Sequence, residues 1–331
     1  MTSVHVIARD NAAGLSRDLG IVADNLTRAG FDVTVSALGQ GGVARSLRHL
    51  RLRTQRAYRH WRDASASQVF DVNVMLERIY PAFFALARRN VLIPNPEWFK
   101  PEYESHLGRL DRVLTKTHHA ETIFDALGCR TEFIGFTSED RLLAEVPREA
   151  AFFHLAGRSG NKGTRPLIDL WLREPTWPML TVVQRDKLPS PLPAAANLRF
   201  VTRYVPDAEL RALQNRYLFH LCPSETEGFG HHMVESMSVG AIVLTTDAPP
   251  MNEMIGPGRG ILTAYCRTNT QHRATTYFVD PAALERDVRR MIALSGEERT
   301  TLATNAREWW STNNLQFHGR LASAVESLFE G

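Results

Sequence analysis

Apolar positions in the first part of the chain follow two different periods. Residues 4–8 and 31–35 are short runs rich in valine, which is typical of buried strands. Residues 17–30 instead repeat apolar side chains every three or four positions, as an amphipathic helix does. A strand, a loop, a helix and a second strand in this order predict the start of a doubly wound α/β domain, whose ligands gather at the carboxyl ends of the strands.

The same alternation continues to the end of the chain. In the first half it predicts a helix at residues 120–127 and strands at residues 70–76, 91–93, 112–117 and 131–135. In the second half it predicts helices at residues 165–173 and 231–239 and strands at residues 151–156, 179–184, 198–204, 217–222 and 241–245. Two short strands around a polar insert follow, at residues 259–262 and 277–279, and then closing helices at residues 281–294, 296–310 and 314–329. The polar stretch at residues 137–149 is predicted to be an interdomain linker.

Composition limits the class of protein. The chain has 331 residues, 44% of them hydrophobic, which is enough for two domains with sizeable cores. Its net charge of +3 is too small to indicate a nucleic-acid partner. The sequence shows neither an apolar run long enough to span a membrane nor a signal-peptide pattern. Its three cysteines are widely spaced, which indicates reduced thiols. We therefore expect a cytoplasmic protein.

The most informative stretch is residues 217–253, where an apolar strand, a Glu-Gly-Phe-Gly turn, a helix and another strand follow each other. Glu227 lies in the turn, and Glu235 lies eight positions later on the helix. A helix N-terminus offers N–H groups and a partial positive charge, which suit phosphate or sugar oxygens. A carboxylate can accept hydrogen bonds from two neighbouring hydroxyls. Together these features indicate a nucleotide sugar as the ligand.

A glycine-rich loop at residues 157–164 follows the first strand of the second half. The P-loop pattern needs Gly-Lys-Ser/Thr, whereas this loop has Lys-Gly-Thr, so that interpretation fails. A dinucleotide fingerprint needs G-x-G-x-x-G, but the spacing here is G-x-x-G-x-x-G, with Asp186 as the nearby acid. A third interpretation depends on a family resemblance.

The segments PSETEGFG and VESMSVGAIV together resemble the donor-site signature of retaining glycosyltransferases with the GT-B fold, most closely those of family 4. That signature has two glutamates separated by seven residues. The resemblance covers residues 150–330 by motif and the first half by architecture. It implies two Rossmann-like doubly wound α/β domains that face each other across a cleft: an acceptor domain at residues 1–145 and a donor domain at residues 146–312, with a helix at residues 313–331 crossing back to the first domain.

In this family Arg158 and Lys162 would clamp the donor diphosphate, Glu235 would bind the ribose hydroxyls, and Glu227 would position the sugar. The two cations would offset the charge that builds up on the leaving diphosphate. Because the chain has no Asp-x-Asp pair, we expect no metal and no other cofactor. The donor-binding residues that the resemblance implies are Gly157, Arg158, Lys162, Thr202, Arg203, Tyr204, Glu227, Gly228, Phe229, Gly230 and Glu235. A turn with two surface cations is the alternative for the glycine-rich loop.

On the acceptor side, the candidates follow strands of the first half. Gly14 and Ser16 lie in the loop after the first strand, where the usual double glycine of the family is missing, so a plain connecting loop is the alternative. His118 and His119 are the histidines best placed for catalysis, although they also fit an ordinary helix start. Glu77, at a strand end, is a third candidate.

An unusual basic segment spans residues 39–63. It holds seven arginines, mostly three positions apart: Arg45, Arg48, Arg51, Arg53, Arg56, Arg59 and Arg62. Such spacing predicts a basic amphipathic segment that could contact anionic lipid at the inner face of a membrane. A solvated face with local ion pairs is the alternative.

The sequence therefore predicts a glycosyltransferase of glycan or glycoconjugate biosynthesis, of the hexosyltransferase type. It would move a sugar from a nucleotide-diphosphate sugar to a hydroxyl of a glycan, a lipid-linked glycan or a small molecule, with retention of configuration and without a metal. Two alternatives stay open: a non-catalytic nucleotide-sugar-binding regulator and a nucleotide-sugar epimerase.

Overall fold

The structure is a computed structural model that describes residues 1–9, 14–39 and 68–330. The basic segment at residues 45–62 lies outside these ranges. The chain divides into two compact units, Met1–Phe136 with Leu315–Gly331, and Thr137–Asn314. The second unit therefore begins before the expected boundary at residues 145 and 146. The reason is Arg141, whose buried side chain bonds to residues of the second unit.

The first unit is built on a six-stranded sheet in the order β2-β1-β3-β4-β5-β6, in which every pairing is parallel. Its strands are β1 (Ser3–Arg9), β2 (Asp32–Leu38), β3 (Phe70–Glu77), β4 (Ala87–Pro94), β5 (Arg112–Thr115) and β6 (Thr131–Phe133). The central strands β3 and β4 are buried at most of their positions, as expected for strands covered on both faces of a parallel sheet.

Helices and short 3₁₀ segments connect these strands: α1 (Gly14–Arg28), α3 (His118–Ala126), η1 (Pro81–Leu86), η2 (Pro96–Trp98) and η3 (Pro101–Arg109). In α1, Leu15, Leu19, Val22 and Leu26 recur at helical spacing and are buried. The helix begins at Gly14, so Gly14 and Ser16 lie in its first turn. Their expected place in a loop is wrong, because the apolar stripe already starts at Leu15.

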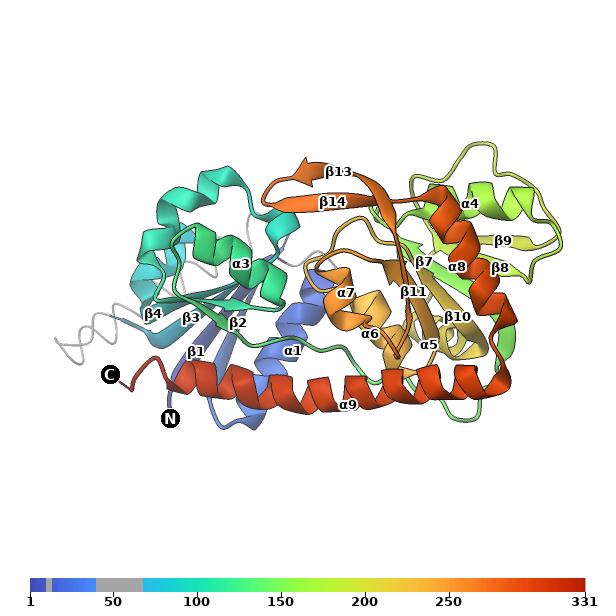
Figure 1. Ribbon diagram of the computed structural model, residues 1–331. Helices are drawn as coiled ribbons and strands as arrows, with labels where there is room; N and C mark the ends of the chain where they lie inside the picture. Colours follow the sequence, from blue (N-terminus) through green and yellow to red (C-terminus); the bar gives the residue numbers. More distant parts are fainter. Residues whose placement is uncertain (10–13, 40–67, 331) are drawn as a thin grey trace. The chain divides into compact units, whose positions relative to one another are not determined.

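The second unit has another six-stranded parallel sheet, in the order β12-β11-β10-β7-β8-β9 (Figure 1). Its strands are β7 (Glu149–Gly157), β8 (Leu180–Gln184), β9 (Leu198–Val201), β10 (Tyr217–Cys222), β11 (Ile242–Thr246) and β12 (Ile261–Thr263). Counted along the chain within this unit, the spatial order is 3-2-1-4-5-6, the order of a Rossmann fold. The direction of the strand order reverses between β7 and β10, and ligands bind at such a point.

The helices of the second unit are α4 (Thr164–Arg173), α5 (Asp207–Arg216), α6 (His231–Ser238), α7 (Met251–Met254) and α8 (Pro281–Ala293). Trp171 on α4 is fully buried, and its ring packs edge-to-face against Phe152 and Trp177 at centroid distances of 5.0 and 5.2 Å. Its indole N–H donates to the carbonyl of Pro178 at 2.9 Å, so this large side chain is buried without an unpaired polar group.

Two elements differ from the sequence-based expectation. The two short strands expected at residues 259–262 and 277–279 are present as β12 and β14 (Ala274–Val279). The stretch between them, expected as a polar insert, instead forms β13 (Tyr265–Gln271), which pairs with β14 as an antiparallel hairpin. The first strand of the hairpin is exposed at six of its seven positions, so it lacks the buried alternation that identifies a strand in sequence.

The two closing helices expected at residues 296–310 and 314–329 are one continuous helix, α9 (Gly296–Glu326). Its last part, from Leu315 onward, belongs to the first unit, and the preceding part belongs to the second. The residues between the two expected helices include no proline, so nothing in this stretch forces a helix to stop. No helix within residues 1–9, 14–39 and 68–330 is both long and apolar enough to cross a bilayer.

Candidate functional site

The topology of the second unit brings together two loops that are far apart in sequence, with Lys162 on one and Glu227, 65 residues later, on the other. Because β7 and β10 are adjacent and parallel, the loops that leave their carboxyl ends meet at the same edge of the sheet. The glycine-rich loop follows β7, and the Glu-Gly-Phe-Gly turn follows β10. A backbone hydrogen bond of 2.9 Å joins them, from the Glu225 N–H to the Asn161 carbonyl. The two motifs recognised separately in the sequence are therefore one structural site.

The glycine-rich loop is held by short-range hydrogen bonds. The Ser159 N–H donates to the Ala156 carbonyl at 3.0 Å, and the Gln184 amide at the end of β8 donates to the Ser159 carbonyl at 3.0 Å. Gly157 and Gly163 have φ angles of +60° and +64°, which side chains rarely adopt. A Cβ atom at Gly163 would also overlap with the carbonyl oxygen of Pro223, whereas one at Gly157 would meet nothing within 4 Å.

This difference predicts unequal effects of two matched substitutions. Gly157→Ala should lower the free energy of unfolding by about 1–2 kcal/mol, the cost of a left-handed alanine. Gly163→Ala should lower it by about 2–5 kcal/mol, because overpacking of about 1–3 kcal/mol is added to that strain. Urea unfolding of both variants checks this, and equal losses of stability would contradict the close approach of Gly163 to Pro223.

Lys162, Glu227 and His232 form a compact polar cluster at the junction of the two loops. The Lys162 ammonium donates to the Glu227 carboxylate, and its Nζ atom lies 3.4 Å from Nδ1 of His232. Nε2 of His232 lies 3.2 Å from the Ser224 hydroxyl and 3.9 Å from the Glu227 carboxylate. The side chains of Lys162, Glu227 and His232 are only 15%, 11% and 8% exposed. The predicted sites Lys162 and Glu227 are thus brought together, while His232 was missed in the sequence.

The histidines around this cluster are kept neutral by their surroundings. Burial, followed by the positive charge of Lys162, holds the pKa of His232 well below its ordinary value. Burial also lowers the pKa of His154 to about 4. The two ring nitrogens of His154 form hydrogen bonds with the Leu221 carbonyl at 2.7 Å and the Thr164 hydroxyl at 2.8 Å. The cluster therefore has one cation, Lys162, facing one carboxylate.

Gly230 shapes the start of α6. It is the N-cap residue, with a φ angle of +89°, and a Cβ atom there would overlap with Cε of Met233. The ring of the buried Phe229 packs edge-to-face against His231 at 5.5 Å. No side chain caps this end of α6, where the N–H groups of Met233 and Val234 donate to the Gly230 carbonyl at 2.9 and 3.3 Å.

Glu235 lies in the second turn of α6, as predicted, and the residue is only 2% exposed. The Gln214 amide donates to its carboxylate at 2.8 Å. The Arg141 guanidinium in turn donates to the side-chain amide oxygen (Oε1) of Gln214 at 2.9 Å and to the Asp207 carboxylate at 2.7 Å. This chain of hydrogen bonds fixes the orientation of Glu235. Sequence reasoning missed Arg141 because its polar neighbours indicated a linker.

Arg158 does not join the lysine cluster. Its side chain is 67% exposed, and its Nε atom lies 3.6 Å from the carboxylate of Asp186, which follows β8. The expected pair of cations therefore has one buried member, Lys162, and one exposed member. A surface ion pair of this kind contributes little to stability, so Arg158 can leave Asp186 at small cost.

Three predicted base-binding residues follow the end of β9. That strand ends at Val201, so Thr202, Arg203 and Tyr204 form an exposed turn before α5. Arg203 donates to Glu209 at 2.9 Å, and the Arg185 guanidinium lies 5.9 Å from the centre of the Tyr204 ring. The turn presents an aromatic ring and backbone groups to solvent.

The hairpin β13–β14 borders both loops of the site. The Asn161 amide donates to Gln271 at 2.7 Å, and the Tyr277 N–H donates to the Glu225 carbonyl at 2.7 Å. Burial raises the pKa of the Glu225 carboxyl, and the nearby charge of Arg267 partly opposes this. The sequence signal that could have revealed the hairpin is the threonine-rich run at residues 268–276, because β-branched residues favour strands.

In the first unit, Glu77 is the candidate with the most unusual backbone. It ends β3, next to β1, at the point where the strand order of that sheet reverses. Its φ angle of +69° is rare for a residue with a side chain, and such strain is concentrated at functional sites. The carboxylate is buried and is paired with Arg78, whose Nε donates to it at 3.1 Å.

His118 and His119 are the first two residues of α3. The ring of His118 is exposed, stacks on Phe133 at a centroid distance of 3.8 Å, and lies 2.8 Å from the Glu121 carboxylate. His119 is half-buried, and burial lowers its pKa. These contacts of His118 are therefore local, and the predicted part of both histidines in catalysis stays a prediction.

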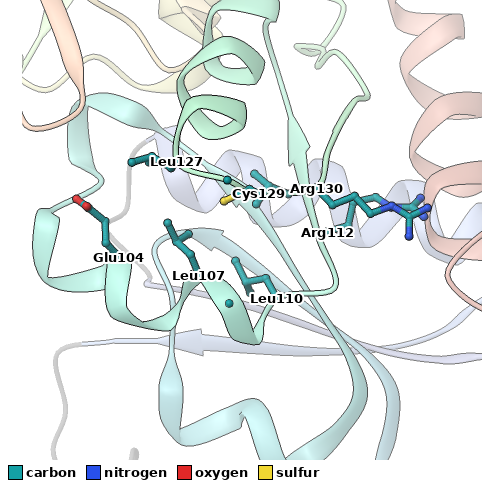
Figure 2. Close-up of a pocket in the computed structure, with 10 residues that line it drawn as sticks. Glu104, Leu107, Leu110, Arg112, Leu127, Cys129 and Arg130 are labelled. Atoms are coloured by element: carbon teal, nitrogen blue, oxygen red, sulfur yellow. The ribbon is translucent and has the colours of Figure 1, made fainter.

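The structure also has a pocket of about 590 Å³ in the first unit, and none of the residues that line it is a predicted site residue (Figure 2). It is lined by Glu104, Leu107, Gly108, Leu110, Arg112, Val113, Leu127, Gly128, Cys129 and Arg130. Since Arg112 begins β5 and Arg130 precedes β6, the pocket lies at the amino-terminal edge of the sheet. Ligands of doubly wound sheets gather at the opposite edge.

Within the described parts of the chain, no group of three or more histidine, cysteine, aspartate or glutamate residues is arranged to hold a metal ion. The expected metal independence stays a prediction.

Comparison with known proteins gives a family match for part of the chain. Residues 194–309 match the family described as Glycosyl transferases group 1. The matched stretch contains Glu227 and Glu235 and begins after Lys162. No curated protein matches the chain.

Solved structures resemble the whole chain. Sucrose-phosphate synthase from Thermosynechococcus elongatus is 14% identical, with a TM-score of 0.72 over 100% of both chains. A glycosyltransferase from Rickettsia africae is 13% identical, with a TM-score of 0.72 over 100% of this chain and 99% of that one. Anabaena HepE, solved in complex with UDP-glucose, is 15% identical, with a TM-score of 0.72 over 99% of this chain and 100% of that one. At these identities the likeness concerns the fold, and it confirms the predicted α/β class with two Rossmann-like domains of the GT-B type.

Proposed function

We propose, on the premise that residues 194–309 form a Glycosyl transferases group 1 domain, that this protein is a glycosyltransferase that uses a nucleotide-diphosphate sugar. We further propose that it transfers a hexosyl group to an acceptor hydroxyl with retention of configuration and without a metal. The observation that carries the proposal is the cluster of Lys162 and Glu227, which lies where the strand order of the second sheet reverses.

Each donor group would meet a different part of this site. The diphosphate would lie against the glycine-rich loop, where Lys162 and Arg158 offset its charge. Glu227 and the N–H groups of Phe229 and Gly230 would position the sugar, at the start of α6. Glu235, held by Gln214, would accept hydrogen bonds from the ribose hydroxyls. The exposed turn at residues 202–204 would contact the base.

The transfer itself would be a displacement on one face of the sugar. The bond between the anomeric carbon and the donor phosphate oxygen breaks, and the acceptor oxygen forms the new glycosidic bond. A donor phosphate oxygen accepts the proton of the acceptor hydroxyl, and the nucleoside diphosphate leaves. Lys162 and Arg158 would stabilise the charge that develops on this leaving group, so that catalysis depends on positioning and electrostatics.

The partners follow from this reaction. The donor is a nucleotide sugar, and since HepE was solved with UDP-glucose, UDP is the first nucleotide to test. The acceptor would be a glycan, a lipid-linked glycan or a small molecule with a hydroxyl group. Glu77, with its strained backbone, is the strongest acceptor-side candidate of the first unit.

A thermal-shift screen against UDP, GDP, ADP, dTDP and CMP, with and without magnesium, tests the donor site. A ligand present at 100 times its Kd should stabilise the protein by about 2.7 kcal/mol. We expect a single nucleoside diphosphate to raise Tm equally with and without magnesium. Stabilisation by none of the five would contradict the donor site.

The matching nucleotide sugars then separate the candidate functions. Release of the nucleoside diphosphate with transfer to an acceptor is the expected result. Binding without turnover would identify the non-catalytic regulator, and an epimerised nucleotide sugar as product would identify the epimerase.

A further inference from the structure

Lys162 is held from two sides. On one side its ammonium donates to the Glu227 carboxylate, and on the other its Nζ atom lies 3.4 Å from Nδ1 of His232. His232 belongs to the first turn of α6, and its backbone carbonyl accepts a hydrogen bond of 2.6 Å from the Ser236 hydroxyl. The ring is therefore attached to a helix, whereas Lys162 lies on a loop.

The chemistry of the contact determines which tautomer the ring has. A lysine ammonium only donates hydrogen bonds, so Nδ1 of His232 must accept. A neutral imidazole then carries its proton on Nε2, which lies 3.2 Å from the Ser224 hydroxyl. The buried position of the ring and its low pKa agree with this neutral form, since a second cation beside Lys162 would be repelled.

We propose that His232 is a positioning residue, which holds the Lys162 ammonium between its Nδ1 atom and the Glu227 carboxylate. This inference rests on the proposed function for one point only, namely that the ammonium so placed faces the donor diphosphate. A neutral acceptor orients the lysine without competing with an anionic ligand for its charge. Without it, Lys162 would be directed by Glu227 alone.

Two substitutions separate the two ring nitrogens. An asparagine at position 232 places an acceptor oxygen near the position of Nδ1, whereas a glutamine places its amide near the position of Nε2. His232→Asn should therefore keep Lys162 in place, and His232→Gln should release it. Both side chains are neutral and polar, so the pair is matched for charge and for burial.

The first readout needs no ligand. The chain has four lysines, at positions 100, 116, 162 and 187, so limiting acetic anhydride followed by peptide mass spectrometry gives the rate of acetylation at each. We expect Lys162 to react several-fold faster in His232→Gln than in the wild type, and at the wild-type rate in His232→Asn. The exposed Lys100, in the first unit, is the internal reference. Equal Lys162 rates in the three proteins would overturn the proposal.

The second readout is transfer kinetics with the nucleotide sugar that the screen identifies. A hydrogen bond to a charged group predicts a loss of about 10-fold to 100-fold in kcat for His232→Gln. His232→Asn should stay within about threefold of the wild type, and a loss as large as that of His232→Gln would overturn the proposal. If the wild type neither binds nucleotides nor transfers sugar, the proposed function fails, and the acetylation rates still decide whether His232 holds Lys162.

Discussion

Replacing Lys162 by methionine is expected to lower kcat for sugar transfer by about 100-fold to 1,000-fold, the typical cost of removing one group that stabilises charge in a transition state. Methionine keeps an unbranched side chain that is one atom shorter and removes the charge. The leaving diphosphate would then face Arg158 alone, which is 67% exposed. Steady-state kinetics with the identified donor measures the effect.

Lys100→Met is the matched control, because Lys100 is an exposed lysine of the first unit that lies 3.7 Å from Glu102. Its kcat should equal that of the wild type. A Lys162→Met enzyme with wild-type kcat would show that the cluster is only structural.

The free energy of unfolding distinguishes the structural role of Lys162 from its catalytic role. Lys162→Met leaves the Glu227 carboxylate, which is 11% exposed, without its cation, and breaking a buried pair in this way costs about 3–5 kcal/mol. Adding Glu227→Gln removes the unpaired charge and should restore most of the stability. Activity should stay low in the double variant, since the positive charge opposite the diphosphate is still missing.

Replacing Glu235 by alanine is expected to raise the donor KM by about 10-fold to 100-fold, because hydrogen bonds to a charged group are worth about 1.5–3 kcal/mol. The carboxylate would otherwise hold the ribose hydroxyls in the orientation that Gln214 and Arg141 fix. The effect should appear mainly in KM, since the ribose is remote from the bond that breaks.

A nucleotide lacking both ribose hydroxyls tests this role directly. The wild type should bind the 2′,3′-dideoxy nucleotide much more weakly than the parent nucleotide, and Glu235→Ala should bind the two equally. Glu297→Ala, an exposed glutamate in the first turn of α9, should behave as the wild type does. An unchanged donor KM in Glu235→Ala would remove the ribose assignment.

The sequence by itself determined the features that depend on local pattern. Apolar periodicity identified the alternating strands and helices, because a buried strand or helix face must be apolar at fixed intervals. The spacing of Glu227 and Glu235 around a glycine turn indicated the donor motif, since the strand, the turn and α6 are continuous in the chain. Lys162 was recognised as a candidate in the same way.

Contacts between distant segments were decided only by the tertiary structure. The pairing of β7 with β10 brings Lys162 to Glu227, and no local pattern encodes this neighbour relation. Arg141 in the supposed linker and His232 in α6 gained their roles from partners far away in sequence. The exposed hairpin β13–β14 and the unbroken α9 were missed for a related reason: an element that is stabilised by distant neighbours need not show the apolar period from which sequence reasoning starts.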